Sequence, residues 1–111
     1  MADADVGHGL LHISFRHPGG SYDVLFAQTA PVLRIDGEPV DVAGWNATVT
    51  VALSAGRHRI LTAFRMGALQ TLGLAERRID IAAGDDRSWN YDAPKLPGRI
   101  GDLRETPRAI G

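Results

Sequence analysis

Apolar side chains at every second position mark the stretch 48–64, TVTVALSAGRHRILTAF. The alternating positions are Val49, Val51 and Leu53, followed by His58, Ile60, Thr62 and Phe64. Successive strand side chains point to opposite faces, so both runs can share one buried face. Gly56, in the break between them, can take the positive φ that hairpin loops commonly need. The stretch predicts a β-hairpin whose outward positions are Thr48, Thr50, Arg57 and Arg59.

The same two-residue period recurs along most of the chain, between turns rich in glycine, proline and aspartate. It predicts further strands at residues 10–16, 22–27, 32–36, 76–83 and 87–91. A chain of 111 residues can bury one core and not two. We therefore expect one all-β domain over residues 1–93, a mostly antiparallel β-sandwich of seven or eight strands, immunoglobulin- or transthyretin-like in layout. Residues 94–111, with prolines, glycines and scattered apolar positions, predict an extended C-terminal arm without a strand of its own.

Composition excludes several classes of function. The formal net charge of -1 gives no overall attraction to nucleic acid or to an anionic membrane. The chain has no cysteine, which removes disulfides, thiolate nucleophiles and cysteine zinc sites. No apolar run approaches the length of about 18 residues that a membrane span needs, and the first residues lack the basic and apolar regions of a secretory signal. We expect a cytoplasmic protein with no cofactor, no nucleic-acid partner and no membrane partner.

Three segments together resemble a known family. They are Leu33-Arg34-Ile35-Asp36-Gly37, the strand Thr48–Leu53, and Ala55-Gly56-Arg57-His58-Arg59-Ile60. Their order is similar to the small bacterial β-sandwich repeats of the PEGA type, in which a strand ends in an Asp-Gly turn and a later strand opens with a glycine and, two positions on, a His or Tyr. The similarity covers roughly residues 32–83, without the Pro-Glu-Gly-Ala run that names the family. It implies a sandwich that acts as a binding or accessory module and carries no catalytic residues.

The end of the chain carries a second resemblance. The run Trp89–Pro94, followed by Gly98–Gly101, is similar to uncharacterised single-domain actinobacterial proteins of the same architecture. This resemblance also implies a sandwich of seven or eight strands that acts as a binding or accessory module.

The four histidines are the residues best suited to metal binding or proton transfer. On a strand, His8 and His12 lie about 13 Å apart at roughly 3.3 Å per residue, whereas zinc lies about 2 Å from its nitrogen ligands. We therefore expect His8, His12 and His17 to be exposed strand and loop residues without a metal. His58 shares a face with Ile60 and predicts a partly buried ring bonded to loop backbone, because no nucleophile or orienting carboxylate is indicated for it.

The stretch 65–75, RMGALQTLGLA, breaks the alternation. Its apolar residues fit neither strand nor helix spacing, and Gly67 and Gly73 interrupt them. It predicts an irregular connection that either folds back as a lid or is covered by a partner, because large exposed apolar patches are rare in monomers. A partner would be another protein or a second copy of this chain. The candidate contact residues, with two from the arm, are Met66, Leu69, Leu72, Leu74, Ile100 and Leu103.

Aromatic residues provide a second candidate surface. Trp89 and Tyr91 share one strand face, and Trp45 lies in a loop. Flat rings beside a polar donor such as Arg87 suit the stacking of a sugar or similar small molecule. The competing interpretation is that rings at two-residue spacing fill the core of a sandwich.

Charged residues fall mostly on outward positions, where pairs across neighbouring strands contribute little. If they converge, an anion-binding stripe would result from Arg16, Arg34, Arg57 and Arg59. The leading hypothesis from the sequence is a non-catalytic protein-interaction or assembly module that can form a homo-oligomer. The alternatives are a small-ligand or carbohydrate-binding module and, third, a metal-binding protein using histidines.

Overall fold

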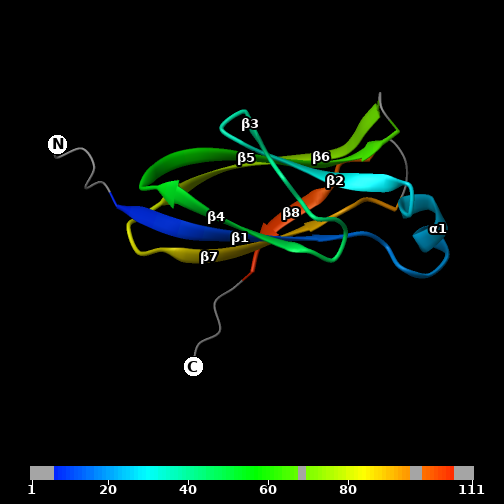
Figure 1. Cartoon of the computed structure of the whole chain (residues 1–111), viewed down its shortest axis with the longest axis horizontal. Coiled ribbons are helices and arrows are strands. Elements are labelled where there is room, and N and C mark those ends of the chain that lie inside the picture. The colour runs from blue at the N-terminus through cyan, green and yellow to red at the C-terminus, as the bar shows by residue number, and fades with distance from the viewer. Residues whose placement is uncertain (1–6, 68–69, 96–98, 107–111) are drawn as a thin grey trace.

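Two four-stranded sheets face each other in the computed structural model, which describes residues 7–67, 70–95 and 99–106 (Figure 1). The first sheet has the strand order β4-β1-β7-β8, and the second has the order β3-β2-β5-β6. Neighbouring strands are antiparallel except for the parallel pair β1 and β7. The predicted all-β, mostly antiparallel sandwich is confirmed. The strands are β1 (His8–Arg16), β2 (Thr29–Ile35), β3 (Glu38–Val40), β4 (Thr48–Ser54), β5 (Gly56–Met66), β6 (Gln70–Ile81), β7 (Asp86–Asp92) and β8 (Asp102–Glu105).

The predicted hairpin at residues 48–64 is wrong in its pairing, although both strands exist. β4 pairs with β1 in the first sheet, while β5 pairs with β2 and β6 in the second. The chain therefore passes from one sheet to the other at Ala55, at the end of the molecule opposite α1 (Asp23–Phe26) (Figure 1). The predicted faces are correct, because a two-residue period defines which side chains turn inward and not which strand lies alongside.

The core lies between the inward faces of the two sheets. Leu11, Ile13 and Phe15 of β1 have no exposed surface, and Ile60 of β5 faces them from the other layer with none. Burying apolar side chains in this way contributes about 1.5–3 kcal/mol for each large residue. Among the described residues, the other buried apolar ones are Phe26, Leu33, Ile35, Leu53, Ala63, Phe64, Ala75, Ile79, Ile81, Trp89, Tyr91, Ala93 and Leu103.

The stretch 65–75 is not an irregular lid, because most of it belongs to the hairpin of β5 and β6. Gly67 has a φ of 66° just after β5 ends. Within β6, Gly73 and Leu74 together face the single residue Ala63, since Thr62 pairs with Ala75 and Phe64 with Leu72. This β-bulge, with Gly73 at a φ of 65°, shifts the alternation by one residue. The shift explains why the apolar pattern fits no regular period.

The predicted strand at residues 22–27 is also wrong. Residues Gly20–Tyr22 form a 3-10 turn, and α1 follows directly. Tyr22 and Phe26 are four residues apart, a spacing that places both on one side of a helical turn as readily as on one side of a strand. Phe26 is buried against the core, whereas Val24 is 81% exposed.

The C-terminal segment contributes a strand that the sequence did not predict. β8 pairs with β7, and Leu103 at its centre is fully buried. Just before it, the Gly101 N–H donates to the Leu74 carbonyl at 3.2 Å, which ties the edge of the first sheet to β6 of the second. Residues 102–105 are therefore part of the sandwich and not of an arm outside it.

We expect a Gly73→Ala substitution to destabilise the fold more than Gly67→Ala. Both glycines have the same positive φ, which costs alanine about 1–2 kcal/mol. A Cβ at Gly67 meets open space, but a Cβ at Gly73 would lie 2.6 Å from the Tyr91 hydroxyl and 2.7 Å from the Phe64 ring. Overpacking of this kind costs roughly 1–3 kcal/mol more. Urea unfolding of the two variants measures the difference, and equal losses would contradict the packing described.

Candidate functional site

The predicted partner-binding residues do not form one surface. Leu103 is buried, and Met66 and Leu72 are half-buried against the core. Leu74 is 50% exposed and Ile100 is 80% exposed, and the hydrogen bond from Gly101 to Leu74 brings these two positions near each other. Leu69 lies outside the described residues.

A second exposed apolar group, at α1, was not predicted from the sequence. Val24 and Leu25 lie at the helical end of the sandwich, where Leu25 borders a small apolar hollow beside Met66 and Leu72. The sequence did not indicate it because the spacing of residues 22–27 predicts a strand, on which Tyr22, Val24 and Phe26 would share one face. A helical turn instead directs Val24 to solvent.

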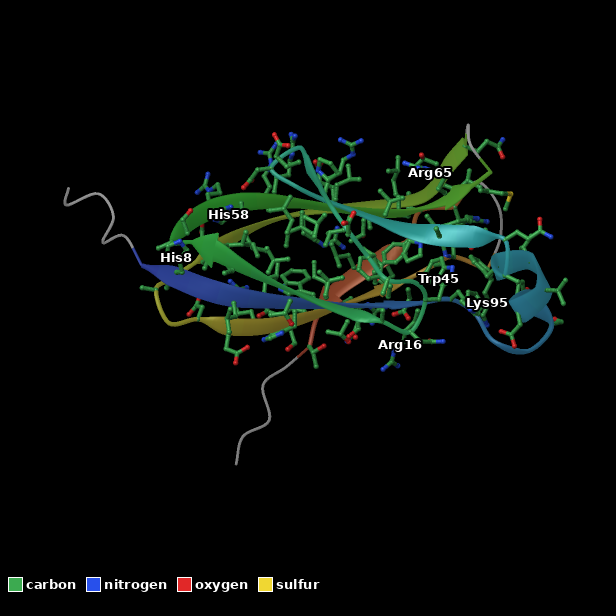
Figure 2. The ribbon with its side chains drawn as sticks, viewed as in Figure 1. His8, Arg16, Trp45, His58, Arg65 and Lys95 are labelled. Atoms are coloured by element: carbon green, nitrogen blue, oxygen red, sulfur yellow. The ribbon has the colours of Figure 1, made fainter. Side chains whose placement is uncertain are left out.

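The predicted sugar-stacking platform is wrong, because the rings lie inside the sandwich. Tyr91 is fully buried and donates its hydroxyl proton to the Gly73 carbonyl at 2.6 Å, and Trp89 is only 7% exposed. Trp45 lies between the sheets near α1 (Figure 2), where it contacts Phe26, Phe64 and Tyr91. These contacts support the competing interpretation that the rings fill the core.

Arg87 is also occupied within the molecule. Its Nε and Nη2 donate to the two carboxylate oxygens of Glu105 at 2.8 and 2.6 Å, and its Nη1 donates to the Asp80 carbonyl at 2.6 Å. The hydrogen bonds to Glu105 raise the pKa of Arg87. The arginine therefore fixes β8 beside β7 and has little left to offer a ligand.

His12 and His17 serve different contacts and do not meet. The His17 ring stacks on Phe26, with ring centres 5.0 Å apart. His12 lies on the solvent-facing side of the first sheet, between Thr50 of β4 and Asp86 of β7. Among the described residues, no three His, Cys, Asp or Glu side chains come together as a metal site would require.

The contacts of His12 resemble the order of groups in a nucleophilic triad. The Asp86 carboxylate, 2.6 Å from Nε2, can only accept, so Nε2 carries a proton. In a neutral ring, Nδ1 then accepts from the Thr50 hydroxyl at 2.8 Å. A triad also needs donors for a developing oxyanion and a recess for substrate. Asp86 is 62% exposed on the outer side of a sheet, and this arrangement is better suited to holding three strands in register.

His58 forms a polar group in which both ring nitrogens have partners, at the end where the chain changes sheets (Figure 2). Its Nε2 lies 2.7 Å from the Ser54 carbonyl, and its Nδ1 lies 2.6 Å from the Asp36 carboxylate. Both partners are acceptors, so the ring makes both hydrogen bonds when both nitrogens carry a proton, as in the imidazolium form. The other Asp36 oxygen accepts the Arg59 N–H at 2.9 Å. We call these residues, Asp36, Ser54, His58 and Arg59, the His58 clamp.

The clamp changes the titration of both charged groups. Burial alone would lower the pKa of His58, but the hydrogen bonds to Asp36 and Ser54 outweigh burial, and the pKa rises above its ordinary 6.5. The Arg59 N–H and then the His58 ring lower the pKa of Asp36 below its ordinary 3.8, against the opposing effect of burial. The sequence placed Asp36 on an outward face, and its left-handed φ of 53° is what turns the carboxylate toward His58.

The free edges of the two sheets differ in their protection. An unpaired strand edge can add another chain, and proteins usually block it with short strands, proline or charge. β3 has three residues and contains Pro39, and β8 has four residues, of which three are charged. β6 carries charged side chains and is tied to Gly101. β4 has seven residues and contains no charge, no proline and no glycine.

The backbone of β4 presents one row of groups to solvent. The Ala47 carbonyl accepts from Phe15, and the Ala55 N–H donates to Gly7, so odd-numbered residues of this segment bond toward β1. Direction alternates along an antiparallel strand, and the N–H and C=O groups of Thr48, Thr50 and Ala52 therefore point away from β1. No strand of the described residues lies on that side, because β4 is the end of its sheet.

Side chains hold β4 firmly to the rest of the first sheet. Ser14 bonds Thr48 at 2.8 Å, and His12 bonds Thr50 at 2.8 Å. Val49 and Val51 point inward but are only half-buried, because no further strand covers them from the open side. The edge is thus a rigid row of unpaired backbone groups above partly exposed valines.

Comparison with family models, with curated proteins and with solved structures finds no match for this chain. The similarity to PEGA-type repeats therefore stays a prediction. Within the described part of the chain, no helix has the length and apolar character to span a membrane.

We expect Asp36→Asn to lower the pKa of His58 toward its ordinary value, because the amide removes the charge and can donate to Nδ1. The raised pKa of His58 means that its protonated form contributes to folding stability. This contribution is fully present below pH 6.5 and is lost as the pH rises through the pKa of His58 in the folded protein. The wild type should therefore exceed the variant by about 1–2 kcal/mol near pH 5–6 and by less at higher pH.

Urea unfolding between pH 5 and 9 measures this difference, and the imidazole NMR signals of His58 give its pKa directly. On the acid side, the contribution of Asp36 is present above pH 3.8 and is lost as the pH falls through its lowered pKa. A stability difference that does not vary with pH, together with an unchanged His58 titration, would contradict the clamp.

Proposed function

We propose that this chain is a non-catalytic assembly module that associates with a second copy of itself through the free edge of β4. The uncharged, unprotected edge is the observation that carries the proposal. Antiparallel pairing of β4 with its symmetry mate would join two four-stranded sheets into one continuous sheet of eight strands. Such an interface is isologous, since the same surface serves on both copies.

A second copy is a suitable occupant because β4 is compatible with itself. In a strand pair related by a twofold axis, a charged residue faces a like charge near the axis, which is unfavourable. β4 carries no charged residue, so self-pairing meets no such repulsion. The half-buried Val49 and Val51 of each copy would also lose contact with water at the junction.

The strength of the association depends on how many unpaired backbone groups β4 offers to its partner. Three residues of each copy, Thr48, Thr50 and Ala52, offer one donor and one acceptor each. Backbone hydrogen bonds contribute about 1 kcal/mol each after exchange with water, and the area of a single strand edge falls short of a standard interface. We expect a reversible, concentration-dependent dimer.

The alternative interfaces have less support. Leu74 and Ile100 are exposed, but the Leu74 carbonyl is already bonded to Gly101 within the chain. The contacts of His12 and His58 hold strands together, which supports a non-catalytic role. The burial of Trp89 and Tyr91 removes the ring faces on which the sugar-binding alternative depended.

We expect Ala52→Pro to abolish dimer formation, because proline removes an outward N–H without touching the bonds between β4 and β1. Ala52→Ser, which keeps that N–H, is the matched control. Sedimentation equilibrium over a range of concentrations should give the wild type and Ala52→Ser a mass approaching 24 kDa, twice the 11.9 kDa of one chain. Ala52→Pro should stay near 11.9 kDa with an unchanged circular dichroism spectrum.

Two results would contradict the proposal. A wild type that remains monomeric at about 1 mM would exclude the dimer. A dimer that forms equally well with Ala52→Pro would place the interface elsewhere.

A further inference from the structure

Arginines gather on the outer face of the second sheet, beside the His58 clamp. Arg59 of β5 lies directly opposite Arg78 of β6, and Arg57 lies opposite Asp80. A hollow of about 260 Å³ opens to solvent here. It is lined by Asp36, Arg57, His58, Arg59 and Arg78.

The hydrogen bonds of these arginines leave most of their donors unused. Arg57 contacts Asp80 through Nε at 3.4 Å, and Arg59 contacts Glu76 through Nε at 3.3 Å. Within the described residues, Arg78 has no ion pair. Arg87 differs, since all three of its guanidinium nitrogens are bonded. The hollow therefore holds guanidinium groups whose terminal nitrogens are available.

The carboxylate of Asp36 does not prevent an anion from binding at this surface. One of its oxygens accepts from the His58 ring and the other accepts the Arg59 N–H. The imidazolium form of His58 balances the charge of Asp36. Of the three arginines that line the hollow, Arg57 has an ion pair with Asp80 and Arg59 has one with Glu76.

We infer that this hollow binds an oxyanion of the phosphate class, either inorganic phosphate or the terminal group of a phosphomonoester. Like charges directly opposite each other weaken a strand pair, and a dianion between Arg59 and Arg78 relieves that repulsion. The planar guanidinium fork matches the spacing of two phosphate oxygens. The open side of the hollow leaves room for the rest of an ester. We call this the Arg78 site.

The Arg78 site is independent of the proposed dimer. It lies on the outer face of the second sheet, whereas β4 is an edge of the first. It also revises the predicted anion stripe, because Arg57 and Arg59 belong to the site while Arg16 is on a strand of the other sheet and Arg34 borders a different hollow.

Titration of ¹⁵N-labelled protein with potassium phosphate at constant ionic strength tests the site, with potassium chloride as the reference. We expect saturable shifts of amides on β5 and β6 with a Kd on the order of 1–10 mM. Arg78→Gln should weaken binding at least tenfold. Arg104→Gln, which alters an exposed arginine of the other sheet, should leave binding unchanged.

Titration with O-phosphoserine distinguishes the two sources. Binding equal to or tighter than that of phosphate assigns a phosphomonoester, and binding of phosphate alone assigns the free ion. The inference is overturned by the absence of saturable shifts up to about 50 mM phosphate. It is equally overturned if Arg78→Gln binds as well as the wild type, or if chloride produces the same shifts.

Discussion

The passage of the chain from β4 to β5 is the feature on which the remaining architecture depends. At Ala55 the backbone leaves the first sheet and enters the second, so that β4 and β5 belong to different sheets instead of pairing with each other. The His58 clamp holds this crossing. It links the end of β2 through Asp36, the end of β4 through the Ser54 carbonyl, and β5 through the Arg59 N–H.

A partly buried ion pair stabilises a fold only when its hydrogen bonds are complete, because removing charges from water is costly. In the clamp both ring nitrogens and both carboxylate oxygens have partners. The same crossing leaves β4 with β1 as its one neighbour, and the second sheet is completed by β2 and β6. The free edge that we propose as an interface is thus a consequence of the crossing.

Much of the fold was predictable from alternation, because the faces of β4 and β5 follow directly from the two-residue period. The pairing of these strands was not predictable, because the same pattern fits both a hairpin within one sheet and a chain that crosses between two sheets. The bond between Asp36 and His58 joins residues 22 positions apart and depends on a left-handed φ at Asp36. The turn residues Asp36-Gly37 indicated that backbone conformation, but no local sequence pattern indicated that the Asp36 carboxylate bonds to His58.

Short or shifted elements were the ones that sequence analysis missed. α1 has four residues, and its apolar spacing fits a strand equally well. β8 has four residues and only Leu103 inward, too few for a recognisable period. Gly73 shifts the pattern of β6 by one residue. Part of the candidate interface could be predicted from the sequence, because TVTVALS lacks charge and proline. That this strand lies at an edge could not be predicted, because it depends on the strand order of the sheet.

Residue-resolved amide hydrogen exchange along β4 tests the crossing and the free edge together. The account predicts slow exchange at Val49, Val51 and Leu53 at every protein concentration, since these amides bond to β1. It predicts fast exchange at Thr50 and Ala52 in dilute protein and slower exchange as the concentration rises. Slow exchange at Thr50 and Ala52 even in dilute protein would mean that another strand already covers that edge, and would contradict the account.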